Sequence, residues 1–163
     1  MQLEIRSATK ADGQNLTPLI NDFVKFMYGL EEEDWGAQTP PHGGLIAENM
    51  FAPDLAVKTL VAEDAEGKII GFLCYHLTFW VGDNRLGGII TAISVAKGNR
   101  EKGVGQALLA KALENIRRRG GAYAIISVHR KNDDAISFYK KLGGDVYDGE
   151  RLILMPLKTE DQS

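Results

Sequence analysis

The sequence predicts a mixed α/β fold, in which a twisted sheet of about seven strands carries helices on both faces. The hydrophobic period alternates between that of strands and that of helices along the chain, in the order βααβββαβαββ. In addition, residues 122–128 are apolar at almost every position, which is typical of a strand buried on both faces. No internal repeat or linker interrupts this pattern.

Composition is that of an ordinary globular protein. The 163 residues fit one domain, so we expect a single domain over residues 1–163 with its core at about 3–157. Hydrophobic residues make up 44% and charged residues 25%, close to globular averages. The formal charge of −3 argues against non-specific nucleic-acid binding, which needs a basic face.

The numbers of cysteines and histidines argue against a disulfide-linked protein and against a metal site. The single cysteine, Cys74, lies in an apolar run and predicts a reduced, buried thiol. One cysteine and three histidines show no metal-ligand spacing, so we expect no metal. The first residues lack the apolar region of a signal peptide, and no stretch reaches the roughly 18 apolar residues of a spanning helix. We expect a soluble, cytoplasmic protein without a membrane or nucleic-acid partner.

Turn and capping residues set the expected boundaries. A capping box at Thr9–Asp12 opens a helix that runs to about Leu30, and Gly143-Gly144 stops the last helix. The expected strands are 3–6, 57–63, 68–80, 87–96 and 122–128, followed by a hairpin over 145–156. The expected helices are 9–30, 45–51, 103–119 and 132–142.

The segment from Ala92 to Leu108 carries the chemistry. A strand enters a loop that contains Arg100 and Lys102 and opens directly into a helix. Unpaired N–H groups at a helix start form an anion site, so a phosphate or pyrophosphate is the expected occupant. The alternative is a tight strand-to-helix turn with solvated charges. In that case the glycines at the helix start would lower the stability of the helix without any gain in ligand binding.

Two nucleotide-binding motifs fail on specific residues of this segment. Gly98 and Gly103 have P-loop spacing, but Val104-Gly105 follows where a lysine and a hydroxyl are required. A dinucleotide fingerprint needs a small residue at position 108, where Leu108 stands.

At these motifs the sequence resembles the GNAT superfamily of acyl-CoA-dependent N-acetyltransferases, over nearly the whole chain. Arg100–Gly105 matches the Arg/Gln-x-x-Gly-x-Gly/Ala signature, Ile5–Asp12 is similar to the first strand and helix start, and Asn132–Gly143 looks like the second signature. The resemblance implies the GNAT fold and acetyl-CoA as co-substrate. The cofactor-binding residues that it implies are Ile93, Val95, Arg100, Glu101, Lys102, Gly103, Val104, Gly105, Gln106, Asn132 and Tyr139.

The resemblance also assigns roles. The loop would wrap the CoA pyrophosphate, and backbone groups of Ile93 and Val95 would pair with the pantetheine amides where their strand splays from the strand ending near Ser127. Asn132 would contact the pantetheine arm or cap its helix. Tyr139 would be the catalytic residue, donating to the departing thiolate; the alternative is a packed aromatic side chain.

The expected reaction is direct transfer of the acetyl group to a primary amine of a small molecule (a polyamine, a diamine or an amino-acid-like compound), without an acetyl-cysteine at Cys74. The chain looks closest to the polyamine branch (spermidine/spermine and thialysine), but Thr91 and Ala92 stand where that branch carries acids. Glu31–Asp34 beside Trp35 could hold a cationic substrate, and His76 could act as a base, although a solvated loop and an ordinary strand histidine are the simpler interpretations.

Two other functions remain open: a protein or peptide N-acetyltransferase, and a catalytically silent CoA-binding sensor, which only the missing strand acid supports. The resemblance also implies a homodimer.

Overall fold

The computed structural model describes residues 2–30, 50–82, 84–150 and 153. Two compact units make up the chain, Met1–His129 and Arg130–Ser163. The expected acidic substrate loop, Glu31–Trp35, lies outside the described residues. So do residues 45–49 of the expected second helix, of which Met50 is the helical residue that is described.

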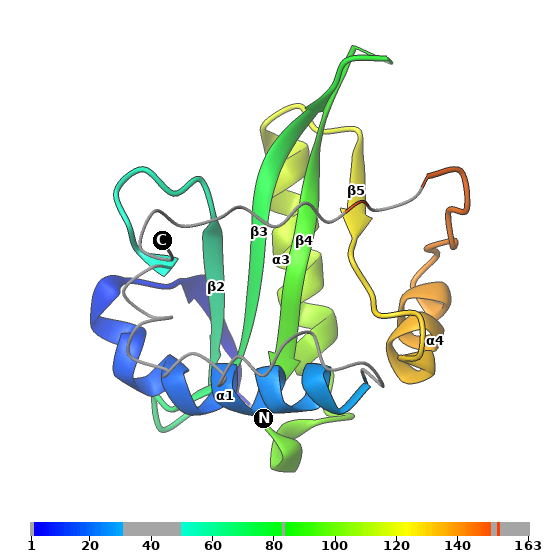
Figure 1. Cartoon of the computed structure of the whole chain (residues 1–163). Coiled ribbons are helices and arrows are strands. Elements are labelled where there is room, and N and C mark those ends of the chain that lie inside the picture. The colour runs from blue at the N-terminus through cyan, green and yellow to red at the C-terminus, as the bar shows by residue number, and fades with distance from the viewer. Residues whose placement is uncertain (1, 31–49, 83, 151–152, 154–163) are drawn as a thin grey trace, which may run out of the picture. The chain divides into compact units, whose positions relative to one another are not determined.

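The first unit is built on a sheet of five described strands in sequential order (Figure 1). Neighbouring strands are antiparallel except for the last pair, which is parallel. This mixed sheet confirms the predicted mixed α/β class. The strands are β1 (Glu4–Ser7), β2 (Lys58–Glu63), β3 (Ile69–Trp80), β4 (Arg85–Val95) and β5 (Tyr123–Ile126).

Two helices of this unit, α1 (Gly13–Leu30) and α3 (Val104–Arg118), cover opposite faces of the sheet. Successive side chains on a strand point to opposite faces. On β3, the Phe72 ring packs edge-on against Phe23 of α1, with centroids 6.2 Å apart. The preceding residue, Gly71, faces α3: a Cβ there would lie 3.2 Å from the Leu108 side chain. Helices on both faces are therefore confirmed.

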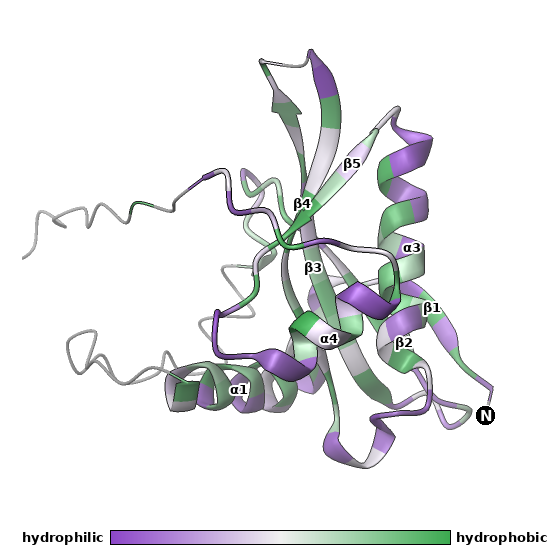
Figure 2. Ribbon diagram, turned by 90° about the vertical axis from the view of Figure 1, so that its right-hand side faces the viewer, coloured by the Kyte–Doolittle hydropathy of each residue, from purple (hydrophilic) through white to green (hydrophobic). Residues whose placement is uncertain are grey.

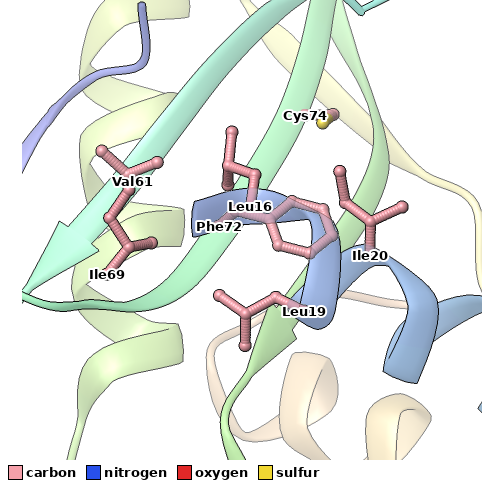
Figure 3. Close-up of a cluster of buried hydrophobic side chains, with 7 residues drawn as sticks. All are labelled: Leu16, Leu19, Ile20, Val61, Ile69, Phe72 and Cys74. Atoms are coloured by element: carbon pink, nitrogen blue, oxygen red, sulfur yellow. The ribbon is translucent and has the colours of Figure 1, made fainter. Parts of the chain in front are cut away.

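Each helix buries an apolar stripe against its face. Beneath α1 lies a cluster of buried side chains (Figure 3), made of Leu16, Leu19, Ile20, Val61, Ile69, Phe72 and Cys74. On α3 the buried residues follow helical spacing, while Arg117 and Arg118 at its end stay exposed. Hydrophobic and hydrophilic positions alternate along α3 (Figure 2). No helix among the described residues is long and apolar enough to cross a membrane.

An ion-pair network fixes the start of α1. The Arg6 guanidinium donates to both carboxylate oxygens of Asp12, at 2.8 Å each, and to Glu63 on β2. Asp12 also accepts the backbone N–H of Thr9 at 2.7 Å, as the predicted capping box requires. The Arg6 guanidinium holds the pKa of Asp12 well below its usual range. This network joins β1, β2 and the helix start.

Two expectations about the sheet need correction. The strand at 122–128 was expected to be buried on both faces, but β5 covers Tyr123–Ile126 and Ile125 is 40% exposed. Among the described strands β5 is an edge, because it pairs with β4 alone. The expected hairpin over 145–156 has no strand in its described part, residues 145–150 and 153; the other positions lie outside the described residues.

The second unit contains α4 (Asp133–Lys141). Asn132 caps its start, since the side-chain oxygen accepts the Ala135 N–H at 3.1 Å. At its end Gly143 adopts a φ of +89°, and the Gly144 N–H donates to the Tyr139 carbonyl at 3.0 Å. The predicted cap and the predicted glycine stop are both confirmed.

Candidate functional site

One edge of β4 loses its strand partner partway along the strand. Pairing with β5 runs from Gly87 opposite Tyr123 to Ile90 opposite Ile126, and the Ser127 N–H donates to the Ile90 carbonyl at 3.1 Å. Beyond this point β4 continues to Val95 paired with β3 alone. No described strand covers this edge of residues 91–95, because β5 ends at Ile126.

A β-bulge lies where the two strands part. Ile90 pairs with Tyr75 and Ala92 pairs with Cys74, so Thr91 is an extra residue in β4. The Thr91 hydroxyl donates to the Cys74 carbonyl at 3.4 Å. From the sequence, Thr91 is notable only because it stands where the polyamine branch carries an acid. The bulge had no signal in the sequence because it depends on which residues pair across two strands.

The bulge reverses which backbone groups face the free edge. Before it, the Ile90 carbonyl points toward β5. After it, the Ala96 N–H donates to Ile70 of β3 at 2.9 Å, so the even-numbered residues turn toward β3. Backbone groups of successive strand residues point to alternate edges. The N–H and C=O groups of Ile93 and Val95 therefore point away from β3, toward the open edge.

The loop that follows β4 contains two residues with a positive φ. A 3₁₀ turn at Lys97–Asn99 leads to Glu101, with a φ of +61°, and Gly103, with a φ of +82°. Gly103 is left-handed and Val104 begins the right-handed helix, so the N–H groups at this junction turn toward one side of the chain. Glu101 has a Cβ and bears a backbone strain of order 1–3 kcal/mol, which the rest of the loop has to support.

The N-terminus of α3 adds further donors. The Ala107 N–H donates to the Gly103 carbonyl at 2.9 Å and closes the first helical turn. The N–H groups of Val104, Gly105 and Gln106 precede that turn and have no acceptor within the helix. Gly103 provides no side-chain cap. Together with the positive end of the helix dipole, these groups offer several donors to one anion.

The two cationic side chains of the loop are bound to backbone carbonyls. The Arg100 Nε donates to the Val95 carbonyl at 3.0 Å, and the Lys102 ammonium donates to the Gly98 carbonyl at 2.7 Å. Both side chains are exposed. Arg100 therefore links the loop to the end of the open edge of β4.

Cys74 lies close to the bulge in the strand pairing but is not suited to be a nucleophile. It is a free thiol with 6% exposure, in contact with the Thr59 hydroxyl at 3.6 Å. Burial raises the pKa of the Cys74 thiol, which keeps it protonated. The predicted buried, reduced cysteine is confirmed. Within the described part of the chain, no three His, Cys, Asp or Glu side chains form a group that could hold a metal ion.

The predicted residues divide between the two units. Ile93, Val95 and the loop Arg100–Gln106 lie together in the first unit, whereas Asn132 and Tyr139 lie on α4 in the second. The Tyr139 ring is half-buried and packs edge-on against Phe138 at 5.1 Å. Burial raises the pKa of Tyr139 to about 12, so its hydroxyl keeps the proton at neutral pH.

Comparison with known proteins identifies the family. The model of the acetyltransferase (GNAT) family matches residues 23–144. The chain is 33% identical over 105 residues to streptothricin acetyltransferase of Streptomyces lavendulae, covering 64% of this chain and 53% of that protein. It is 35% identical over 89 residues to mycothiol acetyltransferase of Saccharomonospora viridis, covering 51% of this chain and 28% of that protein. The chain thus matches about half or less of the length of these relatives.

A solved structure shares the fold. The ribosomal-protein-alanine N-acetyltransferase of Brucella melitensis biovar Abortus 2308 superimposes with a TM-score of 0.77 at 17% identity, covering 94% of this chain and all of that one. At this identity the likeness shows the fold alone. The family model spans most of the chain, including the loop Arg100–Gly105 and all of α4. The chain belongs to the GNAT family of acetyltransferases.

Proposed function

We propose that the protein transfers the acetyl group of acetyl-CoA to a primary amine of a small molecule, by direct attack in a ternary complex. The observation that carries this proposal is the open edge of β4, followed by the loop Arg100–Gly103 and by the first N–H groups of α3, which have no acceptor within the helix. A ligand with an extended diamide arm and a diphosphate matches this arrangement, since the arm can pair with the open edge and the diphosphate can accept from the N–H groups of α3.

The open edge supports binding of the pantetheine arm. The backbone groups of Ile93 and Val95 point to this edge, as they would toward a neighbouring strand. Pantetheine amides can take the place of that strand's peptide groups. One of the N–H groups would also donate to the thioester carbonyl and stabilise the oxyanion that forms when the amine attacks.

The loop and the helix start support binding of the diphosphate. Their N–H groups and the helix dipole favour an anion there, and Arg100 and Lys102 supply positive charge. The residues that we propose to contact this part of CoA are Arg100, Glu101, Lys102, Gly103, Val104, Gly105 and Gln106.

We propose that Tyr139 assists the leaving group. With a pKa of about 12 the phenol is more weakly acidic than a thiol, so full proton transfer to the thiolate is uphill. The hydroxyl would act mainly as a hydrogen-bond donor to the sulfur as the C–S bond breaks. Asn132 already caps α4, and a second contact with the pantetheine arm is compatible with that role.

The acceptor class rests on the relatives. Streptothricin and mycothiol, the compounds in their names, are small molecules, which favours a small-molecule amine for this chain. A polyamine or diamine remains within this class. The two positions where the polyamine branch carries acids hold Thr91, which forms the bulge, and Ala92, which packs against the core under α1. Neither side chain can neutralise an ammonium group.

We further propose that residues 1–163 act as one N-acetyltransferase domain, in the cytoplasm and as a homodimer. Sedimentation velocity at micromolar concentration tests the dimer, and a monomer at the highest soluble concentration would contradict it.

The experiment for the function is release of CoA thiol from acetyl-CoA across a panel of amines: aminoglycosides, streptothricin, diamines, polyamines, amino acids and short peptides. Release with a small amine, and acetylation of that amine seen by mass spectrometry, is the expected result. Release with peptides alone would establish a protein N-acetyltransferase. Binding of acetyl-CoA without release on any amine would favour the CoA sensor and contradict the proposal.

A further inference from the structure

We infer that the Arg100 side chain competes with the pantetheine arm for the Val95 carbonyl. In the free protein Arg100 donates a hydrogen bond to this carbonyl, and on binding of CoA it would move to the diphosphate. The protein would then discriminate against acyl carriers that lack the diphosphate. This inference rests on the proposed function and adds a specificity-determining role for one residue.

The Val95 carbonyl is the group for which Arg100 and the pantetheine arm would compete. It lies at the end of β4, past Ile90, the last residue that pairs with β5, and it points to the open edge. Its hydrogen-bond donor is the Arg100 Nε at 3.0 Å, from five residues farther along the chain. An N–H donor in that position is what a pantetheine amide would supply. The guanidinium and the arm therefore compete for the same carbonyl.

Arg100 has an alternative partner when a diphosphate is bound. The loop leads into the N-terminus of α3, where the N–H groups of Val104, Gly105 and Gln106 favour an anion. A guanidinium forms paired, charge-assisted hydrogen bonds with phosphate oxygens, which are stronger than one bond to a neutral carbonyl. A diphosphate at the loop would therefore attract Arg100 and release the Val95 carbonyl.

The consequence differs between whole and truncated ligands. CoA brings both the arm and the group that draws Arg100 away. Pantetheine has the arm but no diphosphate. When it displaces Arg100 from the Val95 carbonyl, the guanidinium therefore gains no phosphate partner in place of the lost hydrogen bond. The Arg100 side chain is exposed, so it can leave the Val95 carbonyl without opening the core. Removal of this side chain should thus have opposite effects on the two ligands.

Lys102 provides a matched control. It is an exposed cation of the same loop, and its ammonium binds the Gly98 carbonyl, which lies outside β4. Lys102→Ala removes the same charge without uncovering the open edge. Arg100→Lys keeps the charge and removes the planar Nε donor.

The test is isothermal titration of CoA and of pantetheine into the wild-type protein, Arg100→Ala, Arg100→Lys and Lys102→Ala, after circular dichroism has shown equal folding. Arg100→Ala should bind pantetheine about three- to tenfold more tightly than wild type and CoA several-fold more weakly, in line with the net value of one hydrogen bond. Arg100→Lys should gain affinity for pantetheine and retain most of its affinity for CoA. Lys102→Ala should lose affinity for CoA without a gain for pantetheine.

Pantetheine affinity that is unchanged or weaker in Arg100→Ala, or undetectable at millimolar concentration, would overturn the inference, since the guanidinium and the arm would then not compete. An equal gain in pantetheine affinity in Lys102→Ala would also overturn the inference. Failure of the wild-type protein to bind CoA would instead contradict the proposed function.

Discussion

Ile116 of α3 lies directly over Gly88 of β4: a Cβ at Gly88 would come within 2.4 Å of the Ile116 Cδ1 atom. This close approach fits the helix onto the strand just before β4 parts from β5. Gly88 pairs with Ala124, two positions before the last pair of the two strands. Packing of this pair thus supports the part of β4 from which the open edge begins.

Gly88→Val should lower the free energy of unfolding by about 2–3 kcal/mol, because a side chain there overpacks the contact with Ile116. Urea denaturation measures the change. The double variant with Ile116→Ala should lose less stability than the sum of the losses of the two single variants, because the smaller side chain leaves room for the valine. Gly29→Ala is the control: its Cβ meets no atom within 4 Å, and alanine favours the helix. Strict additivity of the two changes would contradict the contact.

Asp12→Asn should destabilise the protein by about 2 kcal/mol at neutral pH, since it weakens the charge-assisted hydrogen bonds from Arg6. The folded-state pKa of Asp12 lies below its unfolded value, so its contribution is present above the unfolded pKa of about 4 and is lost as pH falls toward the folded pKa. Denaturation curves between pH 3 and pH 7 should show a shallower loss of stability for Asp12→Asn than for wild type. Glu4→Gln, at an exposed position of β1, should follow the wild-type curve.

Tyr139→Phe should lower kcat about a hundredfold and change the dissociation constant of acetyl-CoA less than about threefold, because a donor to the leaving group acts mainly in the transition state. The raised pKa of about 12 keeps the hydroxyl protonated, so Tyr139 should add no alkaline fall in kcat below about pH 11. Steady-state rates and equilibrium binding with an acceptor from the panel provide both quantities. Tyr147→Phe, at a 68% exposed side chain, is the control. Equal losses in rate and affinity would make Tyr139 a structural residue.

Cys74→Ala should retain the transfer rate within about threefold, since a buried thiol with a raised pKa is a poor nucleophile. The loss of packing should lower stability by about 1 kcal/mol. Initial rates with both substrates varied should give intersecting double-reciprocal lines, as expected for a ternary complex. Parallel lines that disappear together with activity in the variant would contradict direct transfer.

The sequence predicted those features that depend on local residues. The capping residues Thr9 and Asn132, and the glycine stop after α4, follow from side-chain chemistry within one turn of the chain. The strand-to-helix loop with its glycines could be recognised for the same reason.

Features that depend on pairing between distant segments were not predictable. The bulge at Thr91 exists because Ile90 and Ala92 take successive partners on β3. The exposure of Ile125 depends on which strands pair with β5, not on its apolar neighbours. The hydrogen bond from Arg100 to Val95 depends on the fold of the loop between them. The motif indicated a phosphate ligand for Arg100 but gave no information on the competing carbonyl.

The central claim is that CoA lies along the open edge of β4 and over the start of α3. Titration of the ¹⁵N-labelled protein with CoA tests it most directly through the backbone amide resonances. The amide resonances of Ile93, Val95 and Gly103–Gln106 should shift together and saturate at one dissociation constant, while those at the start of α1 should stay in place. Binding of CoA that leaves these amides unshifted would contradict it.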